Sequence, residues 1–138
     1  MRIHDNKPYL IEIGARAIGG VCGRAHTCCI GENYYEIVLK NILGEKTSFG
    51  KNLEVIPSGV MMLPVPKEGI VKDISGLEKA KKIEGIVDVL ILTKKGDKIQ
   101  AFPKQSCYLG FIIAIGKTTG DTIKALQNSY DNIQIDID

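Results

Sequence analysis

The sequence contains no tryptophan, and its aromatic residues make up only 6% of 138 positions. It also lacks an excess of one charge, because 18 basic residues are balanced by 16 acidic residues and the net charge is +2. Proteins usually bind single-stranded nucleic acid with stacking aromatic side chains and duplexes with strongly basic surfaces. Neither feature is present, so we expect no nucleic-acid partner.

Long apolar runs are missing too. No stretch approaches the roughly 20 apolar residues that a membrane-spanning helix needs. The N-terminal residues MRIHDNK are polar, whereas a secretory signal peptide has an apolar core there. We therefore expect a cytoplasmic protein with no membrane partner.

The four cysteines give only a weak indication of metal binding. Cys22, Cys28 and Cys29 lie close to His26 in the stretch CGRAHTCC, and Cys107 stands alone. The spacing does not match the paired ligands of zinc sites, and a second ligand pair is missing. The simplest interpretation is free thiols that pack as small apolar groups. A cysteine-based metal or redox protein is kept as an alternative.

A partial nucleotide-binding motif lies near the C-terminus. The stretch IGKTTG contains Gly116, Lys117 and Thr118, in the order that ends a phosphate-binding P-loop. That motif also needs a glycine five residues before Gly116, where this chain has Phe111. We therefore expect a strand end that turns into a helix, with a threonine as N-cap.

Apolar periodicity predicts a chain of mixed helices and strands. Expected helices cover a short segment within 19–31 and residues 32–44, 76–83 and 119–133. In the last helix, Ile123, Leu126 and Tyr130 are expected on one apolar side. Expected strands cover 8–13, 53–66 at an edge, 69–74, 87–93 paired as a hairpin with 97–102, 108–118 and 133–138. From residue 55 onward we expect one sheet with two helices on one face.

The stretch PYLIEIGARAIGG at residues 8–20 places charged side chains at the end of an apolar strand. Burying Glu12 without a partner is costly, so it must face water, a cation or a metal. Gly19 and Gly20 let the backbone bend and approach a ligand closely. An acid, the base Arg16 and exposed backbone N–H groups together suit a metal–phosphate ligand. On Glu12 and Arg16 alone, a surface ion pair beside a bend is the alternative.

YLIEIGARAIGG resembles the last metal-and-substrate strand of ATP-grasp ligases, which ends in a glutamate followed by an arginine four residues later and a Gly–Gly pair. The similarity is closest to L-amino acid ligases and to related carbamoyl-phosphate-synthase-like and biotin-carboxylase-like enzymes. Residues 55–137 also resemble the C-terminal domain of the amino acid ligases. The resemblance implies an α+β fold. Residues 1–50 would be the C-terminal end of an ATP-grasp domain, and residues 51–138 a small, mainly antiparallel sheet with helices on one face.

The same resemblance implies the chemistry. ATP-grasp ligases use ATP to activate a carboxylate as an acyl-phosphate, which an amine then attacks. Glu12 matches a Mg²⁺ ligand, Arg16 matches the arginine that holds the transferred phosphoryl group, and Gly19 and Gly20 match the glycine loop near the carboxylate substrate. Gly14 departs from the asparagine that many members use as a further metal ligand.

The phosphate-binding lysine, the adenine pocket and the first metal carboxylate of that fold have no counterpart in this sequence. We therefore expect a C-terminal fragment. Its parent would use Mg²⁺, ATP and small carboxylate and amine substrates, whereas the isolated chain would bind no cofactor tightly and be inactive. An unpaired edge at Tyr9–Ile13 predicts a homodimer or higher oligomer. A stand-alone small-molecule binding module on the same scaffold is a further alternative.

Overall fold

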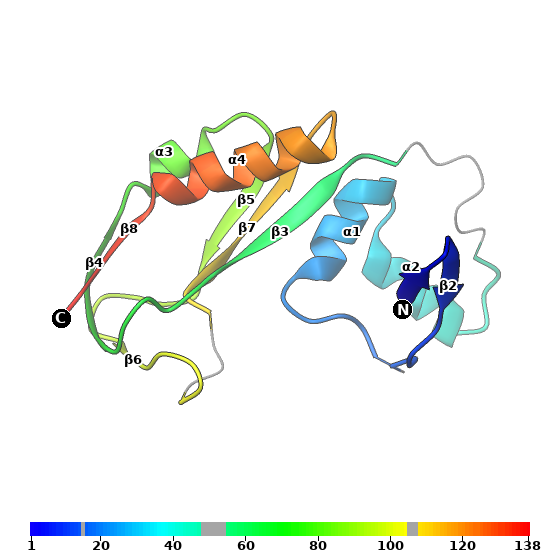
Figure 1. Cartoon of the computed structure of the whole chain (residues 1–138), viewed down its shortest axis with the longest axis horizontal. Coiled ribbons are helices and arrows are strands. Elements are labelled where there is room, and N and C mark those ends of the chain that lie inside the picture. Colours follow the sequence, from blue (N-terminus) through cyan, green and yellow to red (C-terminus); the bar gives the residue numbers. More distant parts are fainter. Residues whose placement is uncertain (15, 48–54, 105–107) are drawn as a thin grey trace.

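The computed structural model describes residues 1–14, 16–47, 55–104 and 108–138. Figure 1 shows a smaller N-terminal part, with a hairpin and two helices, beside a larger part in which two helices cover strands. The α+β class is therefore confirmed. The expected boundary between residues 50 and 51 lies outside the described residues. No helix in the described part of the chain has the length and apolar character needed to cross a membrane.

The N-terminal hairpin joins β1 (Arg2–His4) to β2 (Lys7–Tyr9). Its turn residues Asp5 and Asn6 have φ values of 48° and 57°, as a two-residue type I′ turn requires. The expected strand 8–13 is too long, because the structure ends β2 at Tyr9. Arg2 already pairs with Tyr9, so residues 10–13 lie beyond the hairpin and have no ladder to hold them extended.

Two helices follow, α1 (Cys22–Ile30) and α2 (Tyr34–Ile42). The side chain of Asn33 caps α2 by accepting hydrogen bonds from the backbone N–H groups of Tyr35 and Glu36. After α2, Gly44 adopts a left-handed φ of 75°, which suits a residue just beyond a helix end. Both predicted helices are confirmed, but α2 buries none of its residues among those described.

The first sheet has the order β3-β7-β5, with β7 antiparallel to both neighbours. These strands are β3 (Ser58–Leu63), β5 (Ile86–Ile91) and β7 (Gly110–Ile115). The expected edge position of β3 is confirmed. The central strand β7 is buried over five consecutive residues, which explains why its sequence is continuously apolar.

The second sheet has the order β6-β4-β8. It contains β4 (Gly69–Ser75), β6 (Lys98–Ile99) and β8 (Gln134–Ile137). The strands from residue 55 onward thus form two sheets where one was expected. The expected hairpin between 87–93 and 97–102 is also wrong, because β5 pairs with β7 while β6 pairs with β4. The long apolar β7 offers β5 more buried surface than the two-residue β6 can.

Helices α3 (Leu77–Lys81) and α4 (Thr119–Asp131) lie side by side on one face of the first sheet (Figure 1). Helix α4 begins with a capping box, in which Thr118 and Asp121 satisfy each other's backbone N–H groups. Its buried residues are Thr122, Ala125, Leu126 and Ser129. The expected apolar side is therefore only partly right, since Ile123 and Tyr130 remain 49% and 40% exposed.

The main core lies between α4 and the first sheet and continues into the second. Ile112 and Ala114 of β7 are fully buried in it, together with Leu126 of α4 and Val71 of β4. Ile113 is also fully buried, but alternation along a strand turns it to the opposite face. That face must be covered by another element, and the contacts of α1 with β3 and β7 identify it as α1.

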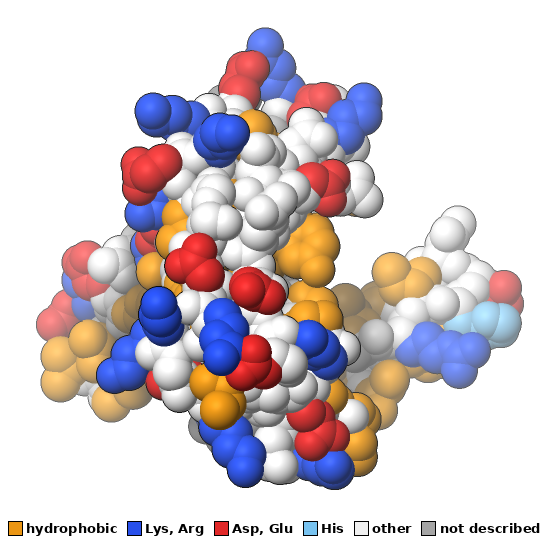
Figure 2. All heavy atoms as spheres, turned by 90° about the vertical axis from the view of Figure 1, so that its left-hand side faces the viewer, with side chains coloured by type: hydrophobic (Ala, Val, Ile, Leu, Met, Phe, Trp, Pro, Cys, Tyr) orange, Lys and Arg blue, Asp and Glu red, His pale blue; other side chains and the backbone are white. Residues whose placement is uncertain are grey.

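The outer surface of the larger part carries charges of both signs. Figure 2 shows lysine, arginine, aspartate and glutamate side chains interspersed over the face that lies at the left of Figure 1. The larger part has two exposed ion pairs among its charged side chains, Lys72 with Asp138 at 2.8 Å and Lys104 with Glu68 at 2.7 Å. Exposed pairs of this kind contribute little to stability.

Candidate functional site

The residues singled out by the sequence lie on the loop between β2 and α1. Glu12 and Arg16 are both exposed. Nη1 of Arg16 donates a hydrogen bond of 3.3 Å to the carbonyl of its neighbour Ala17. No ion pair joins Glu12 or Arg16 to another described residue. The structure therefore does not support the simple surface ion pair between them, and it leaves both charged groups open to a ligand.

Gly20 attaches this loop to the larger part of the molecule. It has a left-handed φ of 65°, which glycine adopts at no steric cost. A Cβ at this position would collide with Cε of Met62 on β3. Gly19 has neither constraint, because its position has open space and no left-handed φ. Of the two glycines, only Gly20 is needed for close contact with the sheet.

Helix α1 continues from this loop and lies across the first sheet. Oγ of Ser58 on β3 donates a 2.8 Å hydrogen bond to the carbonyl of Ala25. On the other edge strand, Oδ2 of Asp88 on β5 accepts a 2.7 Å hydrogen bond from Nη2 of Arg24. On the opposite face, a Cβ at Gly59 of β3 would contact Leu126 of α4. The central sheet is thus enclosed between α4 and α1.

Sequence reasoning did not find Met62, Arg24 or Asp88. Arg24 and Asp88 are 64 positions apart, and no local pattern links such distant residues. Asp88 does carry a weak signal, because it is a single charged residue inside the otherwise apolar run VDVLIL. A charge in such a run needs a partner, and the fold supplies Arg24.

The fit of Mg²⁺ to this loop depends on Glu12. Its carboxylate is a hard oxygen ligand on an exposed loop, and Mg²⁺ commonly takes one or two carboxylates together with phosphate oxygens. No group of three or more His, Cys, Asp or Glu side chains that could hold a metal occurs in the described residues. Among the described residues, Glu12 would thus supply a single carboxylate ligand, and phosphate oxygens would supply further ligands of Mg²⁺.

Three of the cysteines lie on α1. Cys22, Cys28 and Cys29 are free thiols and half-buried, while Cys107 lies outside the described residues. The ring of His26 packs against Tyr34 with a centroid distance of 5.3 Å. His26 therefore lies at the contact between α1 and α2.

The GKT stretch forms the strand end and N-cap that the sequence predicted. Strand β7 ends at Ile115 and Thr118 caps α4. Gly116 allows the strand end to approach the helix, because a Cβ there would lie 2.6 Å from the backbone nitrogen of Thr122.

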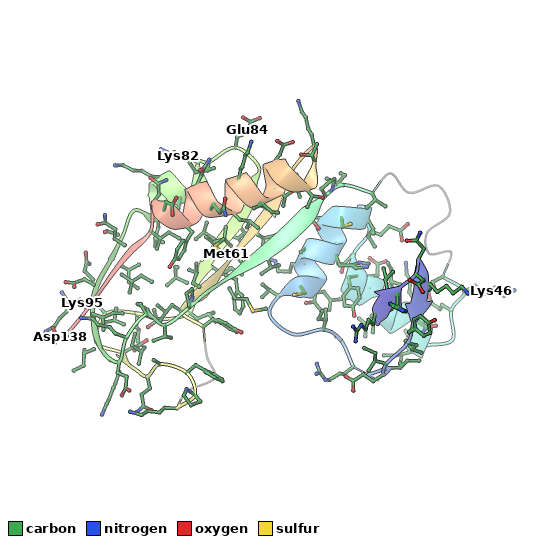
Figure 3. The ribbon with its side chains drawn as sticks, in the orientation of Figure 1. Lys46, Met61, Lys82, Glu84, Lys95 and Asp138 are labelled. Atoms are coloured by element: carbon green, nitrogen blue, oxygen red, sulfur yellow. The ribbon has the colours of Figure 1, made fainter. Side chains whose placement is uncertain are left out.

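An open cavity of about 960 Å³ lies beside this helix start. It has an apolar wall, which includes Ile83 and Ile115, and a charged rim with Glu84, Lys117 and Lys124. Figure 3 labels Glu84 in the turn before β5, beside α4. None of Glu12, Arg16, Gly19 and Gly20 lines this cavity, so it is separate from the loop.

Comparison with known proteins places these features in context. The family described as L-amino acid ligase C-terminal domain 2 matches residues 61–138. The crystal structure of an L-amino acid ligase from Bacillus licheniformis is 31% identical and has a TM-score of 0.79, over 97% of this chain and 34% of that one. No curated protein gives a significant match.

Two further solved structures share the fold. A phosphoribosylglycinamide synthetase from Anaerococcus prevotii has a TM-score of 0.80 at 23% identity, over 99% of this chain and 35% of that chain. An N5-carboxyaminoimidazole ribonucleotide synthetase from Thermotoga maritima has a TM-score of 0.59 at 16% identity, over 86% and 31%. The present chain thus spans about a third of the length of these solved relatives.

Proposed function

The chain belongs to the family described as L-amino acid ligase C-terminal domain 2, and from that premise we propose that it is the C-terminal part of an ATP-grasp ligase that joins a carboxylate to an amine. The observation that carries this proposal is the similarity to the Bacillus licheniformis L-amino acid ligase over 97% of the chain. That similarity covers far more of the chain than the family match at residues 61–138. The division into residues 1–50 and 51–138 is part of the same proposal, and the family match at residues 61–138 lies within the second part.

The roles of the loop residues follow from their chemistry. ATP, bound with Mg²⁺, supplies the phosphoryl group that activates the carboxylate substrate. Glu12 would hold one Mg²⁺ through its exposed carboxylate. Arg16 would place its planar guanidinium on the transferred phosphoryl group, where two parallel hydrogen bonds spread the developing charge. The backbone at Gly19 and Gly20 would allow the carboxylate substrate to approach closely.

The first test is the coding sequence that precedes Met1. An in-frame extension that encodes a phosphate-binding lysine and a second acidic strand supports the proposal. The complete polypeptide should then release ADP when supplied with Mg·ATP and amino acids. If the gene encodes no such extension, the ligase proposal is wrong for this chain.

The second test uses variants of the complete polypeptide. Glu12→Gln should abolish amino-acid-dependent ADP release, because the amide keeps the shape of the side chain but loses the charge that binds Mg²⁺. Glu45→Gln, at another exposed loop carboxylate, should leave ADP release unchanged. Equal rates for Glu12→Gln and the unmodified enzyme would exclude the role given to Glu12.

A small-molecule binding module without catalysis is a second candidate, favoured by the open cavity beside α4. Fold alone does not separate it from a ligase. It predicts that a ligand protects Lys117 and Lys124 from amine-reactive reagents while Glu12 and Arg16 have no effect on its binding.

A further inference from the structure

Helix α1 is tied to both edge strands of the central sheet. At β3, Ser58 donates a hydrogen bond to the carbonyl of Ala25, and Met62 packs against Gly20. At β5, Arg24 forms an ion pair with Asp88 at 2.7 Å. Because β3 and β5 flank β7, these contacts fix the direction in which α1 crosses the sheet.

The Arg24–Asp88 pair is better built than the other ion pairs of the described residues. Oδ1 of Asp88 accepts a 2.8 Å hydrogen bond from the backbone N–H of Val89, while Oδ2 accepts from Arg24. The carboxylate is therefore held in one orientation. The side chains are 43% and 30% exposed, compared with 60% and 48% for Lys104 and Glu68. Partial burial and a fixed acceptor both strengthen a charged hydrogen bond.

Arg24 is connected to the proposed reacting groups by a short and sharply bent backbone. Only seven residues separate it from Arg16. Between them, Gly20 and Val21 both adopt left-handed φ values, 65° and 54°, and the N–H of Cys22 donates to the carbonyl of Gly19 at 3.3 Å. Because this turn is tight, the position of the loop before α1 depends on the position of α1 itself.

We propose that Arg24 and Asp88 are positioning residues of the ligase, which hold α1 on the sheet and thereby place Arg16 and the Gly19–Gly20 backbone for phosphoryl transfer. This inference rests on the proposed function. Neither residue touches the reacting atoms. Their effect acts through geometry, and a displacement of about 1 Å in a reacting group can lower a rate by roughly a hundredfold.

The first measurement needs no enzyme activity. Cys22, Cys28 and Cys29 lie on α1 and are half-buried free thiols, so their labelling by a maleimide reports how firmly α1 is held. In Arg24→Met, we expect labelling of these thiols to accelerate roughly two- to fivefold, as the loss of a partly exposed ion pair allows. Mass spectrometry separates the labelled peptides from that of Cys107.

A double-mutant cycle shows whether the pair itself is responsible. Asp88→Asn should accelerate labelling as much as Arg24→Met, and the double variant should be no faster than either single one, because the two changes remove one interaction. Arg24→Lys, which keeps the charge, should restore slow labelling in part. Lys104→Met, which removes an ion pair of equal length elsewhere, should leave the α1 thiols unchanged.

The second measurement is amino-acid-dependent ADP release by the complete polypeptide. Arg24→Met and Asp88→Asn should lower kcat about ten- to a hundredfold with little change in KM for Mg·ATP. The reason is that a displaced Arg16 would weaken binding of the transition state more than binding of Mg·ATP in the ground state. Lys104→Met should retain the unmodified kcat.

The possible results separate the two proposals. Faster labelling with unchanged kcat would overturn the positioning role and leave the ligase function intact. Unchanged labelling in Arg24→Met would overturn the anchoring of α1 itself. Absence of ADP release from the unmodified polypeptide would overturn the proposed function, and the thiol labelling would still decide whether the pair anchors α1.

Discussion

At the scale of single residues, neighbouring positions of one motif differ sharply in what the structure demands of them. Gly19 and Gly20 are neighbouring glycines, and the sequence alone does not distinguish them. Gly20 alone has a left-handed backbone and lies under Met62. A side chain is therefore tolerated at Gly19, whereas at Gly20 it would strain the backbone and displace the end of Met62, although both glycines belong to the same predicted substrate loop.

This difference gives a direct stability prediction. Gly20→Ala should lower the free energy of unfolding by about 1 to 2 kcal/mol, mainly from the strained left-handed backbone, because the flexible end of Met62 can move aside. Denaturant unfolding followed by circular dichroism measures it. Gly19→Ala is the matched control and should change the free energy by less than about 0.5 kcal/mol. Equal losses for the two variants would contradict the left-handed backbone at Gly20.

A second residue-scale prediction concerns Glu36 and Lys40 on α2. Their side chains form an ion pair at 2.6 Å. This hydrogen bond, and then the charge of Lys40, lower the pKa of the Glu36 carboxyl below its ordinary value of 4.5. The same hydrogen bond and the charge of Glu36 raise the pKa of Lys40 above its ordinary value of 10.5.

The sign of the pH dependence follows from these directions. Because the folded pKa of Glu36 is lowered, the pair stabilises α2 above about pH 4.5 and loses this effect as pH falls through the lowered pKa. Because the folded pKa of Lys40 is raised, the effect persists until pH rises past that raised pKa. An NMR titration of the Glu36 carboxyl should give a higher pKa in Lys40→Met than in the unmodified chain. Identical titrations would show that the pair does not form in solution.

At the scale of elements, the sequence predicted most helices and strands but not how the strands pair. The existence of α2, α4, β7 and β8 follows from local periodicity and caps, such as Thr118 before α4. Pairing depends on distant residues. Residues 87–93 and 97–102 flank a turn and look like a hairpin, yet β5 lies against β7 and β6 against β4.

The same reason limits what the sequence says about the site. Glu12 and Arg16 belong to one short motif and could be proposed from it. Arg24 and Asp88 come from different parts of the chain, so only the fold brings them together. Likewise, the helical period of α4 identifies an apolar stripe, but the rotation of the helix about its own axis on the sheet decides which part of that stripe is buried.

A prediction at the element scale tests this rotation of α4. Leu126 is 7% exposed and Ile123 is 49% exposed, although the sequence places both on one apolar side of α4. Leu126→Ala should cost about 2 to 5 kcal/mol of unfolding free energy, whereas Ile123→Ala should cost less than about 1 kcal/mol. Thermal or denaturant unfolding of the two variants provides the comparison. A larger loss for Ile123→Ala would mean that α4 is rotated about its axis.

At the scale of the whole molecule, the N-terminal part leaves large apolar side chains uncovered. Leu10, Ile11 and Ile13 are 67%, 70% and 80% exposed, and Leu39 and Ile42 of α2 are 60% and 73% exposed. Large apolar side chains left exposed in this number often mark a surface that meets another one. The solved relatives are about three times as long as this chain.

The 138-residue chain should therefore associate in solution. We expect a homodimer or higher oligomer, seen by light scattering as a mass above the 15.1 kDa of one chain. The double variant Leu39→Ser with Ile42→Ser should shift the mass toward one chain. Leu92→Ser, at a residue 64% exposed elsewhere in the molecule, should not. A single-chain mass at high concentration would show that this surface is not used for self-association.

The 138-residue chain should also fail to turn over ATP by itself. Phosphoryl transfer needs several positioned charges, and the loop offers Glu12 and Arg16 alone. Calorimetry should detect weak or no binding of Mg·ATP. Hydrolysis at an enzyme-like rate that Glu12→Gln leaves unchanged would overturn both the proposed role of Glu12 and the dependence on further residues.

The central place of β7 has a consequence for how the protein is made. Strands β3 and β5 pair with β7 and not with each other, and β7 ends only at Ile115. During synthesis from the N-terminus, β3 and β5 remain unpaired until β7 has been made. The apolar stretch Val60–Leu63 of β3 remains unpaired longest. Unpaired apolar strands of nascent chains recruit other chains. We therefore expect the soluble yield of newly made protein to rise when a chaperone that shields apolar segments is supplied in excess.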